Sequence, residues 1–439
     1  MGPFLASAAR RLTEPSVRFT DTGTDWRAVA RRISATLAAP SAVSAPLAID
    51  DADPLAYAAH AITALAAGHS ILLCNPHWTA AERTAAETLR LLPAESGIRF
   101  ASPPILIATG GSSGALRFAT HSTATLSAAA LALQSWLGGA PLNSVCLLPL
   151  HHVSGFQQLV RALATGGDLL LADWHALAGG HRPEPPSVTG GWILSLVPTQ
   201  LQRLVEDPAA CAWLRGFAAI LLGGAPAGPA LLARARAERL PLAIAYGASE
   251  TAAVFAAQAP ADFLAGRSGL LPLPHAAIRI VDPESGRPSA AGQLGRIEID
   301  ASSLFLGYWP DQRPPGPLLS DDLGFLDVDG RLHLAGRADA AINSGGEKVQ
   351  PAEVEAALRA TGAFSEVIVC AAPDPRWGEC VAALFPAADA PDLGAVEQTL
   401  RAVLSPHKLP RRWLAVATWP RTAQGKTDRA ALRRLAANP

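Results

Sequence analysis

The chain has 439 residues, of which 49% are hydrophobic and 17% are charged, which excludes a disordered chain of the polar, highly charged kind. Lys and Arg total 36 and Asp and Glu total 37, so the formal net charge is −1. This balance argues against nucleic acid or an anionic membrane surface as the main partner. The length is sufficient for one large domain and a smaller one.

Cysteine usage and the absence of long apolar runs suggest where the protein works. The five cysteines are scattered without a CxxC spacing, which disfavours a zinc site or a disulfide framework and suits a reducing compartment. The first residues lack the apolar stretch of a secretory signal, and no apolar run approaches the ~20 residues of a membrane span. We therefore expect a soluble, cytoplasmic protein.

Short apolar runs alternate with longer segments of helical periodicity over the first part of the chain, a pattern typical of an α/β fold. The expected strands lie at 105–108, 145–148, 193–197, 219–222 and 242–245, and the expected helices at 127–137, 156–163, 199–205 and 229–239.

From about residue 277 the pattern changes to short strands, at 278–281, 296–299 and 331–334, separated by Gly, Pro and Asp turns. This predicts a small antiparallel barrel. A compact tail follows, with helices at 352–360, 393–404 and from Asp428, and strands at 367–371 and 413–417. Pro351 stands where proline is favoured, at a helix start. We place the domain boundary near Asp339, which gives a domain of residues 1–338 and another of residues 339–439.

A glycine- and serine-rich segment, TGGSSGALR (109–117), follows the expected strand at 105–108. Its glycines let backbone N–H groups crowd around an anion, and its hydroxyls add donors. The segment lacks the GK[ST] of a Walker loop, and in isolation such a segment is more often an ordinary turn. The candidate phosphate-binding residues are Thr109, Gly110, Gly111, Ser112, Ser113, Gly114 and Arg117.

A second segment, AYGASET (245–251), places an aromatic ring beside glycine and a carboxylate. The ring can lie flat on a nucleotide base, and Glu250 offers a hard oxygen to Mg²⁺. In isolation, a surface turn with a solvated glutamate would be the default interpretation. Together with the upstream turn GGAP (223–226), the candidate residues are Gly223, Gly224, Ala225, Tyr246, Gly247, Ser249 and Thr251.

Three further segments complete an ordered series. SDDLG (320–324) offers Asp322 to a ribose diol. GRADAAINSGGEKVQPAEVE (336–355) combines Arg337, a possible pivot at Asp339 and a glycine pair. PRTAQGKTDR (420–429) carries Lys426, one of only three lysines in the chain.

In this order, the five segments resemble the motifs of the acyl-adenylate-forming enzymes, the AMP-dependent acyl-CoA synthetase superfamily. TGGSSGALR is similar to T-S-G-T-T-G-x-P-K, AYGASET to Y-G-x-T-E, and SDDLG to T-G-D-x-G. The last two resemble the family's G-R-x-D hinge region and its P-x-T-x-x-G-K-x-x-R. The resemblance covers nearly the whole chain from residue 109 onward. Leu116 and Arg117 depart from it, since they stand where the family has Pro-Lys. We expect ATP binding to be retained, because Arg117 keeps the positive charge.

The resemblance implies a large N-terminal domain of α/β layers with a small β-barrel, and a smaller, mobile α+β C-terminal domain. ATP and Mg²⁺ are the implied cofactors and coenzyme A the co-substrate, with Glu250 as metal ligand and Lys426 as catalytic cation. Asp322 and Arg337 would hold the ribose hydroxyls. The C-terminal domain would rotate about Asp339 between half-reactions, bringing Ser344, Gly345, Gly346 and Glu347 to a thioester tunnel.

The segment PLHHVSG (149–155) bears on the acid that is activated. It resembles the acyl-pocket motif of the CoA ligases, with His152 where amino-acid-activating relatives carry an aspartate. Segments 196–204, 220–226 and 344–355 resemble the o-succinylbenzoate–CoA ligase subfamily, which implies an aryl dicarboxylate substrate and a place in menaquinone or phylloquinone biosynthesis. Two alternatives remain open: a ligase for another aryl or medium-chain acid, and an inactive nucleotide-binding relative.

Overall fold

The computed structural model describes residues 26–36, 45–93, 102–110, 116–183, 191–283, 285–338, 342–344, 347–374, 378–422 and 427–437. The chain divides into two compact units. Unit 1 comprises Met1–Ala225, Glu238–Ala277 and Asp300–Leu318, and unit 2 comprises Pro226–Ala237, Ile278–Ile299 and Leu319–Pro439. Within the described ranges, no helix is long and apolar enough to cross a membrane. The expected domain boundary near Asp339 stays a prediction.

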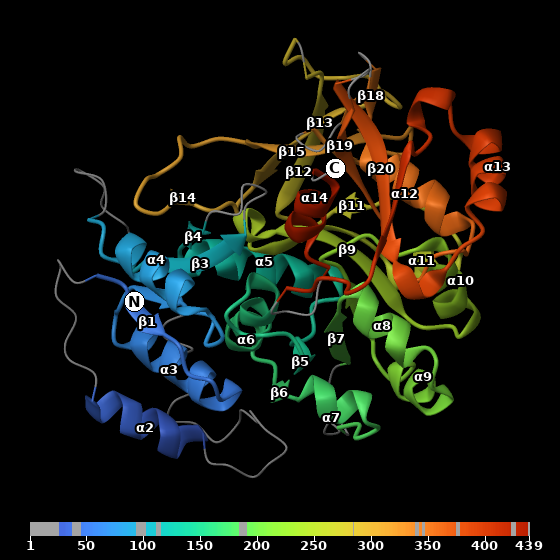
Figure 1. Cartoon of the computed structure of the whole chain (residues 1–439). Helices are drawn as coiled ribbons and strands as arrows, with labels where there is room; N and C mark the ends of the chain where they lie inside the picture. Colours follow the sequence, from blue (N-terminus) through green and yellow to red (C-terminus); the bar gives the residue numbers. More distant parts are fainter. Residues whose placement is uncertain are drawn as a thin grey trace. The chain divides into compact units, whose positions relative to one another are not determined.

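Unit 1 contains two sheets (Figure 1). The first has the order β1-β2-β3-β4-β14, in which β1, β2 and β3 are parallel and β4 is antiparallel to both of its neighbours. Its strands are β1 (Leu47–Ile49), β2 (Ile71–Leu73), β3 (Ile105–Gly110), β4 (Leu116–His121) and β14 (Gly307–Tyr308).

The second sheet has the order β11-β10-β9-β8-β7-β5-β6, with a parallel run from β9 to β6. Its central strands are buried on both faces, as expected of continuous apolar runs. The strands are β5 (Asn143–Cys146), β6 (Leu169–Leu171), β7 (Trp192–Leu196), β8 (Ala219–Leu222), β9 (Leu242–Ala248), β10 (Ala253–Gln258) and β11 (Leu271–Pro272).

A large hydrophobic cluster connects both sheets of unit 1 through α3, α5 and α6. Local signals start and stop these helices: Asp53 caps α3 ahead of Pro54, Ser122 forms a capping box on α5, and Gly166 ends α6 with a φ of 82°. The helices are α2 (Trp26–Thr36), α3 (Pro54–Ala66), α4 (Ala80–Arg90), α5 (Thr123–Trp136), α6 (Val153–Thr165), α7 (Trp174–Ala178), α8 (Pro198–Leu204), α9 (Pro208–Leu214) and α11 (Pro260–Leu264).

The remaining strands form two further sheets, β12-β13-β15-β16 and β18-β17-β20-β19, with β21 beside β20. The first is a four-stranded sheet, and the expected barrel is not confirmed. The strands are β12 (Ala276–Val281), β13 (Gly295–Ala301), β15 (Leu318–Leu326), β16 (Leu332–Arg337), β17 (Ile342–Ser344), β18 (Glu347–Val349), β19 (Ile368–Asp374), β20 (Gly378–Pro386) and β21 (Arg412–Val416). The helices of unit 2 are α10 (Pro229–Ala237), α12 (Pro351–Ala360), α13 (Leu393–Val403) and α14 (Arg429–Ala437).

The mixed α/β class is confirmed, and every strand or helix expected above has a counterpart. Two placements need correction. The expected strand at 145–148 lies at Asn143–Cys146. The strand expected at 242–245 continues to Ala248, because antiparallel pairing with β10 extends it, so Tyr246 and Gly247 lie within the strand rather than after it.

The carboxylate of Glu355 accepts hydrogen bonds from several elements of unit 2, and its side chain is only 2% exposed. It accepts two hydrogen bonds of 2.8 Å from the Arg429 guanidinium, one of 2.6 Å from Arg359 Nη2 and one of 3.0 Å from the Val369 N–H. These bonds fasten α12 to β19 and to the start of α14. The segment that follows Lys426 is thereby anchored to the helix that follows the glycine pair.

We expect Glu355→Ala to lower the free energy of unfolding by about 3–5 kcal/mol, because it leaves two arginines and a buried amide without their shared acceptor. Glu353→Ala is the matched control, since Glu353 lies on the same helix and only pairs with Lys408 at the surface. It should cost under about 1 kcal/mol. Denaturant titration of both variants measures this, and equal losses would contradict the assignment.

Candidate functional site

The glycine- and serine-rich segment joins the end of β3 to the start of β4, and these two strands pair in antiparallel fashion. Thr109 pairs with Arg117 and Gly110 with Leu116, so both ends of the segment belong to strands. Gly111, Ser112, Ser113 and Gly114, the expected phosphate donors, lie outside the described residues. The structure therefore describes the strand residues on either side of this segment.

The segment AYGASET (245–251) contains the end of β9 and a tight turn, η1 (Ser249–Thr251), which we call the acidic turn. Thr251 is fully buried and uses its hydroxyl within the turn, accepting from the Ala248 N–H at 2.9 Å and donating to Ala253 O at 2.7 Å. A Cβ on Gly247 would lie 1.8 Å from Ala253 O, so only glycine fits beside this turn. These two residues shape the backbone that presents Glu250.

Glu250 is held against the first sheet. Its Oε1 accepts a hydrogen bond of 2.6 Å from the hydroxyl of Tyr308, and its backbone carbonyl accepts one of 2.8 Å from the Phe305 N–H. The Arg117 guanidinium carbon lies 4.3 Å from the centre of the Tyr308 ring. The structure thus brings together Glu250 and Arg117, two residues that the sequence places in different motifs.

A buried histidine ties the same turn to β4. His121 is fully buried, and its Nε2 lies 2.7 Å from Ser249 O, while Nδ1 lies 3.0 Å from the Thr125 hydroxyl. Burial lowers the pKa of His121 to about 4. The ring is therefore neutral near pH 7, donating from Nε2 to the carbonyl next to Glu250.

The candidate base-binding residues lie at the ends of β8 and β9. The rings of Tyr246 and Phe255 have centroids 5.0 Å apart. A Cβ on Gly223 would lie 2.9 Å from Ala245 O, so the GGAP turn approaches the β9 backbone closely. Gly224 has a φ of 81°, and both Gly224 and Ala225 are exposed.

The PLHHVSG segment leads into α6, with His152 at its N-cap. The rings of His151 and His152 have centroids 4.4 Å apart, and burial, together with the neighbouring His152 and His77, lowers the pKa of His151 to about 3. A Cβ on Gly155 would lie 2.1 Å from Pro149 O, so this glycine permits the helix to start against the preceding turn.

Helix α6 carries a polar residue that sequence reasoning did not single out. Arg161 is 3% exposed, and its Nη1 has no hydrogen-bond partner within the described part of the chain. Gln158, three residues earlier and fully buried, has an unpartnered Oε1. Burial lowers the pKa of Arg161 to about 10, so it remains charged near neutral pH. The only signal in the sequence is an arginine inside the otherwise apolar second half of this helix.

The remaining candidates belong to unit 2. Asp322 in β15 is directly opposite Arg337 in β16, and the two form an ion pair of 3.3 Å. Arg337 Nη2 also lies 3.5 Å from Asp321. Ser344 and Glu347 pair through their backbones across the β17–β18 hairpin. Asp339, Gly345, Gly346 and Lys426 lie outside the described residues.

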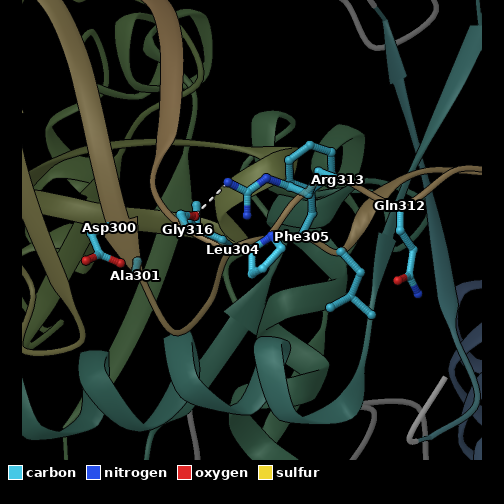
Figure 2. A pocket seen from close by; sticks show the side chains of 9 residues that line it. Asp300, Ala301, Leu304, Phe305, Gln312, Arg313 and Gly316 are labelled. Atoms are coloured by element: carbon cyan, nitrogen blue, oxygen red, sulfur yellow. Dashed lines mark hydrogen bonds between the residues drawn. The ribbon is translucent and has the colours of Figure 1, made fainter. Parts of the chain in front are cut away.

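Unit 1 also has an open cavity of about 480 Å³ that none of the candidate residues lines. Figure 2 shows Asp300 and Ala301 on one side, the Phe305 ring near the centre and Gln312 on the other side. The Arg313 side chain extends across it and donates to Gly316 O at 2.6 Å. Among the described residues, no group of three or more His, Cys, Asp or Glu side chains could hold a metal ion by itself.

The profile of the AMP-binding enzyme family matches residues 10–309, and that of the AMP-binding enzyme C-terminal domain matches residues 353–426. The chain therefore belongs to the AMP-binding enzyme family.

Named relatives agree with this assignment. The 2-succinylbenzoate–CoA ligase of Enterococcus faecalis is 30% identical over 295 residues, which is 64% of this chain and 59% of that protein. A probable 2-succinylbenzoate–CoA ligase of Mycobacterium tuberculosis is 32% identical over 345 residues, 75% of this chain and 84% of that protein. The match thus spans about three fifths of the first relative's length. The Bacillus subtilis o-succinylbenzoate CoA synthetase MenE, solved with the acyl-adenylate OSB-AMP, has the same fold, with a TM-score of 0.80 at 22% identity over 99% of this chain and 98% of that one.

The low pKa of His121 predicts a loss of stability in acid. Its pKa in the folded chain, about 4, lies below the ~6.5 of an unfolded histidine. The stability that the neutral ring contributes is therefore fully present above the unfolded pKa and is lost as the pH falls towards 4. We expect this residue to remove about 2 kcal/mol between pH 7.5 and pH 5.

Unfolding in urea at several pH values measures this effect. Because burial also lowers the pKa of His151 and His275, the test is the difference in slope between the wild type and His121→Gln. The variant should lose stability less steeply as the pH falls. Parallel pH profiles would show that His121 is not a source of the acid sensitivity.

Proposed function

We propose that this protein is an AMP-forming acid–thiol ligase that joins o-succinylbenzoate to coenzyme A through an acyl-AMP intermediate. Membership of the AMP-binding enzyme family supports adenylate chemistry, and the named relatives support the aryl dicarboxylate. A carboxylate is a poor electrophile, and exchanging one of its oxygens for AMP gives the CoA thiol an acyl carbon that it can attack.

Adenylation brings several anionic groups together, so cations and N–H donors are its main requirement. The hairpin of residues 109–117 would hold the β- and γ-phosphates of ATP, Tyr246 and the Gly223–Ala225 turn the adenine, and Asp322 with Arg337 the ribose. Lys426 would bridge the acyl oxygen and the α-phosphate, and His152 would shape the acyl pocket. Rotation about Asp339 would then bring β17 and β18 to the thioester tunnel for the second half-reaction.

The donor chemistry at Glu250 fits Mg²⁺. One carboxylate oxygen accepts from Tyr308, and no donor in the described ranges reaches the other, Oε2. A hard, anionic oxygen is what this cation prefers, usually together with substrate phosphates and water. When bound, Mg²⁺ would neutralise phosphate charge.

Arg161 is the observation that carries the choice of a dicarboxylate. Within the described residues, Nη1 of this buried guanidinium has no hydrogen-bond partner, which is costly because a buried charge needs compensation for the water that it has lost. A second carboxylate on the substrate would supply the missing partner through a charge-assisted hydrogen bond. Arg161 lies on α6, the helix that His152 caps, and in this proposal that helix carries the guanidinium to the far side of the expected acyl pocket.

Lys426→Ala should abolish acyl-AMP formation while largely sparing thioester formation from supplied acyl-AMP, because the lysine acts on charge that develops only in the first half-reaction. Pyrophosphate release measures the first step, and acyl-CoA formation from synthetic acyl-AMP the second. Lys408→Ala is the control, since Lys408 pairs with Glu353 at the surface. Equal loss of both half-reactions in the Lys426 variant would count against its role.

The role of Arg161 is tested with two acids that differ by one carboxylate, o-succinylbenzoate and 4-oxo-4-phenylbutanoate. The wild type should prefer the dicarboxylate in kcat/KM, and Arg161→Met should reduce this preference about 10- to 100-fold, as expected for a charged hydrogen bond of ~1.5–3 kcal/mol. The same variant should unfold at a higher temperature, because a buried unpaired charge is replaced by an apolar chain.

The exposed Arg203 of α8 provides the control, and Arg203→Met should change neither the preference nor the unfolding temperature. A preference that survives in Arg161→Met would show that another group meets the second carboxylate. An unfolding temperature lowered by the substitution would show that the guanidinium is already compensated inside the protein.

A further inference from the structure

Three side chains from distant parts of the sequence form a continuous chain of contacts in unit 1. The Arg117 guanidinium lies over the Tyr308 ring at 4.3 Å, and the Tyr308 hydroxyl donates to Glu250 Oε1 at 2.6 Å. Arg117 ends the phosphate hairpin, Glu250 lies in the acidic turn, and Tyr308 belongs to neither motif. One aromatic ring therefore connects the candidate phosphate ligand with the candidate metal ligand.

The ring of Tyr308 is fixed on several sides. Its backbone pairs with Ala119 of β4, two residues beyond Arg117, and the Phe305 ring packs edge-on against it with centroids 4.9 Å apart. The N–H of Phe305 in turn donates to the Glu250 carbonyl. The phenol hydroxyl therefore has little freedom, and its bond sets the direction in which the Glu250 carboxylate points.

The guanidinium affects this bond through the ring. A cation over the face of an aromatic ring attracts its π electrons. The phenol O–H then becomes a stronger donor towards the carboxylate. The stronger bond holds Oε1 in place and leaves Oε2 for the cation.

We propose that Tyr308 is a positioning residue for the magnesium ligand Glu250, and that Arg117 controls it through the cation–π contact. The proposal rests on the proposed function, in which Glu250 binds Mg²⁺ with ATP. It also gives a reason for arginine at position 117, because a planar guanidinium can stack on the ring while its N–H groups remain free to meet phosphate.

The first experiment measures magnesium-dependent ATP binding rather than turnover. ATP binding is titrated by calorimetry at a series of Mg²⁺ concentrations, for the wild type, Tyr308→Phe and Tyr57→Phe. Tyr57 is the matched control, because its hydroxyl donates to Cys74 O in the core and not to Glu250. Tyr308→Phe should raise the Mg²⁺ concentration for half-maximal binding several-fold, and leave ATP binding without Mg²⁺ unchanged.

The second experiment observes the phenol directly. The chain has only three tyrosines, so protein labelled with ¹³C at tyrosine Cζ gives three resonances, and Tyr308→Phe identifies the relevant one. In the absence of ligand, Arg117→Gln should shift this resonance and leave those of Tyr57 and Tyr246 in place. Adding Mg²⁺ and ATP to the wild type should shift it as well.

The outcomes separate the two proposals. A wild type that binds no ATP at any Mg²⁺ concentration overturns the proposed function and this inference together. A Tyr308→Phe protein that binds ATP with the Mg²⁺ dependence of the wild type overturns the inference alone. A Tyr308 resonance insensitive to Arg117→Gln overturns the part assigned to Arg117.

Discussion

The site of unit 1 depends on the attachment of one acidic turn to one strand. Glu250 carries a negative charge close to a hairpin expected to bind phosphates, so its position must be fixed before a cation can be shared between them. His121 donates to the carbonyl of the residue before Glu250. The Phe305 N–H donates to the Glu250 carbonyl, and the Tyr308 hydroxyl donates to the Glu250 carboxylate. Neutrality of the buried His121 matters here, because a second proton would place an unpaired charge in the core.

Arg161, which we propose meets the acyl substrate, carries the opposite charge to Glu250. Among the described residues, Nη1 of the buried Arg161 has no hydrogen-bond partner, whereas Glu250 has one carboxylate oxygen that accepts from Tyr308. The buried, unpartnered Nη1 of Arg161 is unfavourable in the protein alone, and both charged groups would gain from a ligand of opposite charge. Stability given up at such groups is the usual sign that a binding site has been selected for its ligand.

The sequence predicted the parts of the fold that depend on local signals. Apolar runs such as those of β7 and β8 need no knowledge of their partners, and Pro351 marks the start of α12 within the chain itself. The strands β4 and β10 were missed although each pairs with the strand just before it, and β14 was missed because its pairing joins distant segments. β14, for example, pairs with a strand almost 190 positions earlier. The candidate site shows the same division: Glu250 is recognisable by its motif, whereas Tyr308 and Arg161 become visible only through contact and burial.

The proposed function requires this protein to activate o-succinylbenzoate with ATP and to transfer the acyl group to coenzyme A. The most direct test is to incubate the purified protein with ATP, Mg²⁺, coenzyme A and o-succinylbenzoate, and to quantify all nucleotide and thioester products by mass spectrometry. The account predicts o-succinylbenzoyl-CoA and AMP in equal amounts, with neither formed when the acid is omitted. Formation of ADP in place of AMP, or the absence of any thioester with this acid, would contradict it.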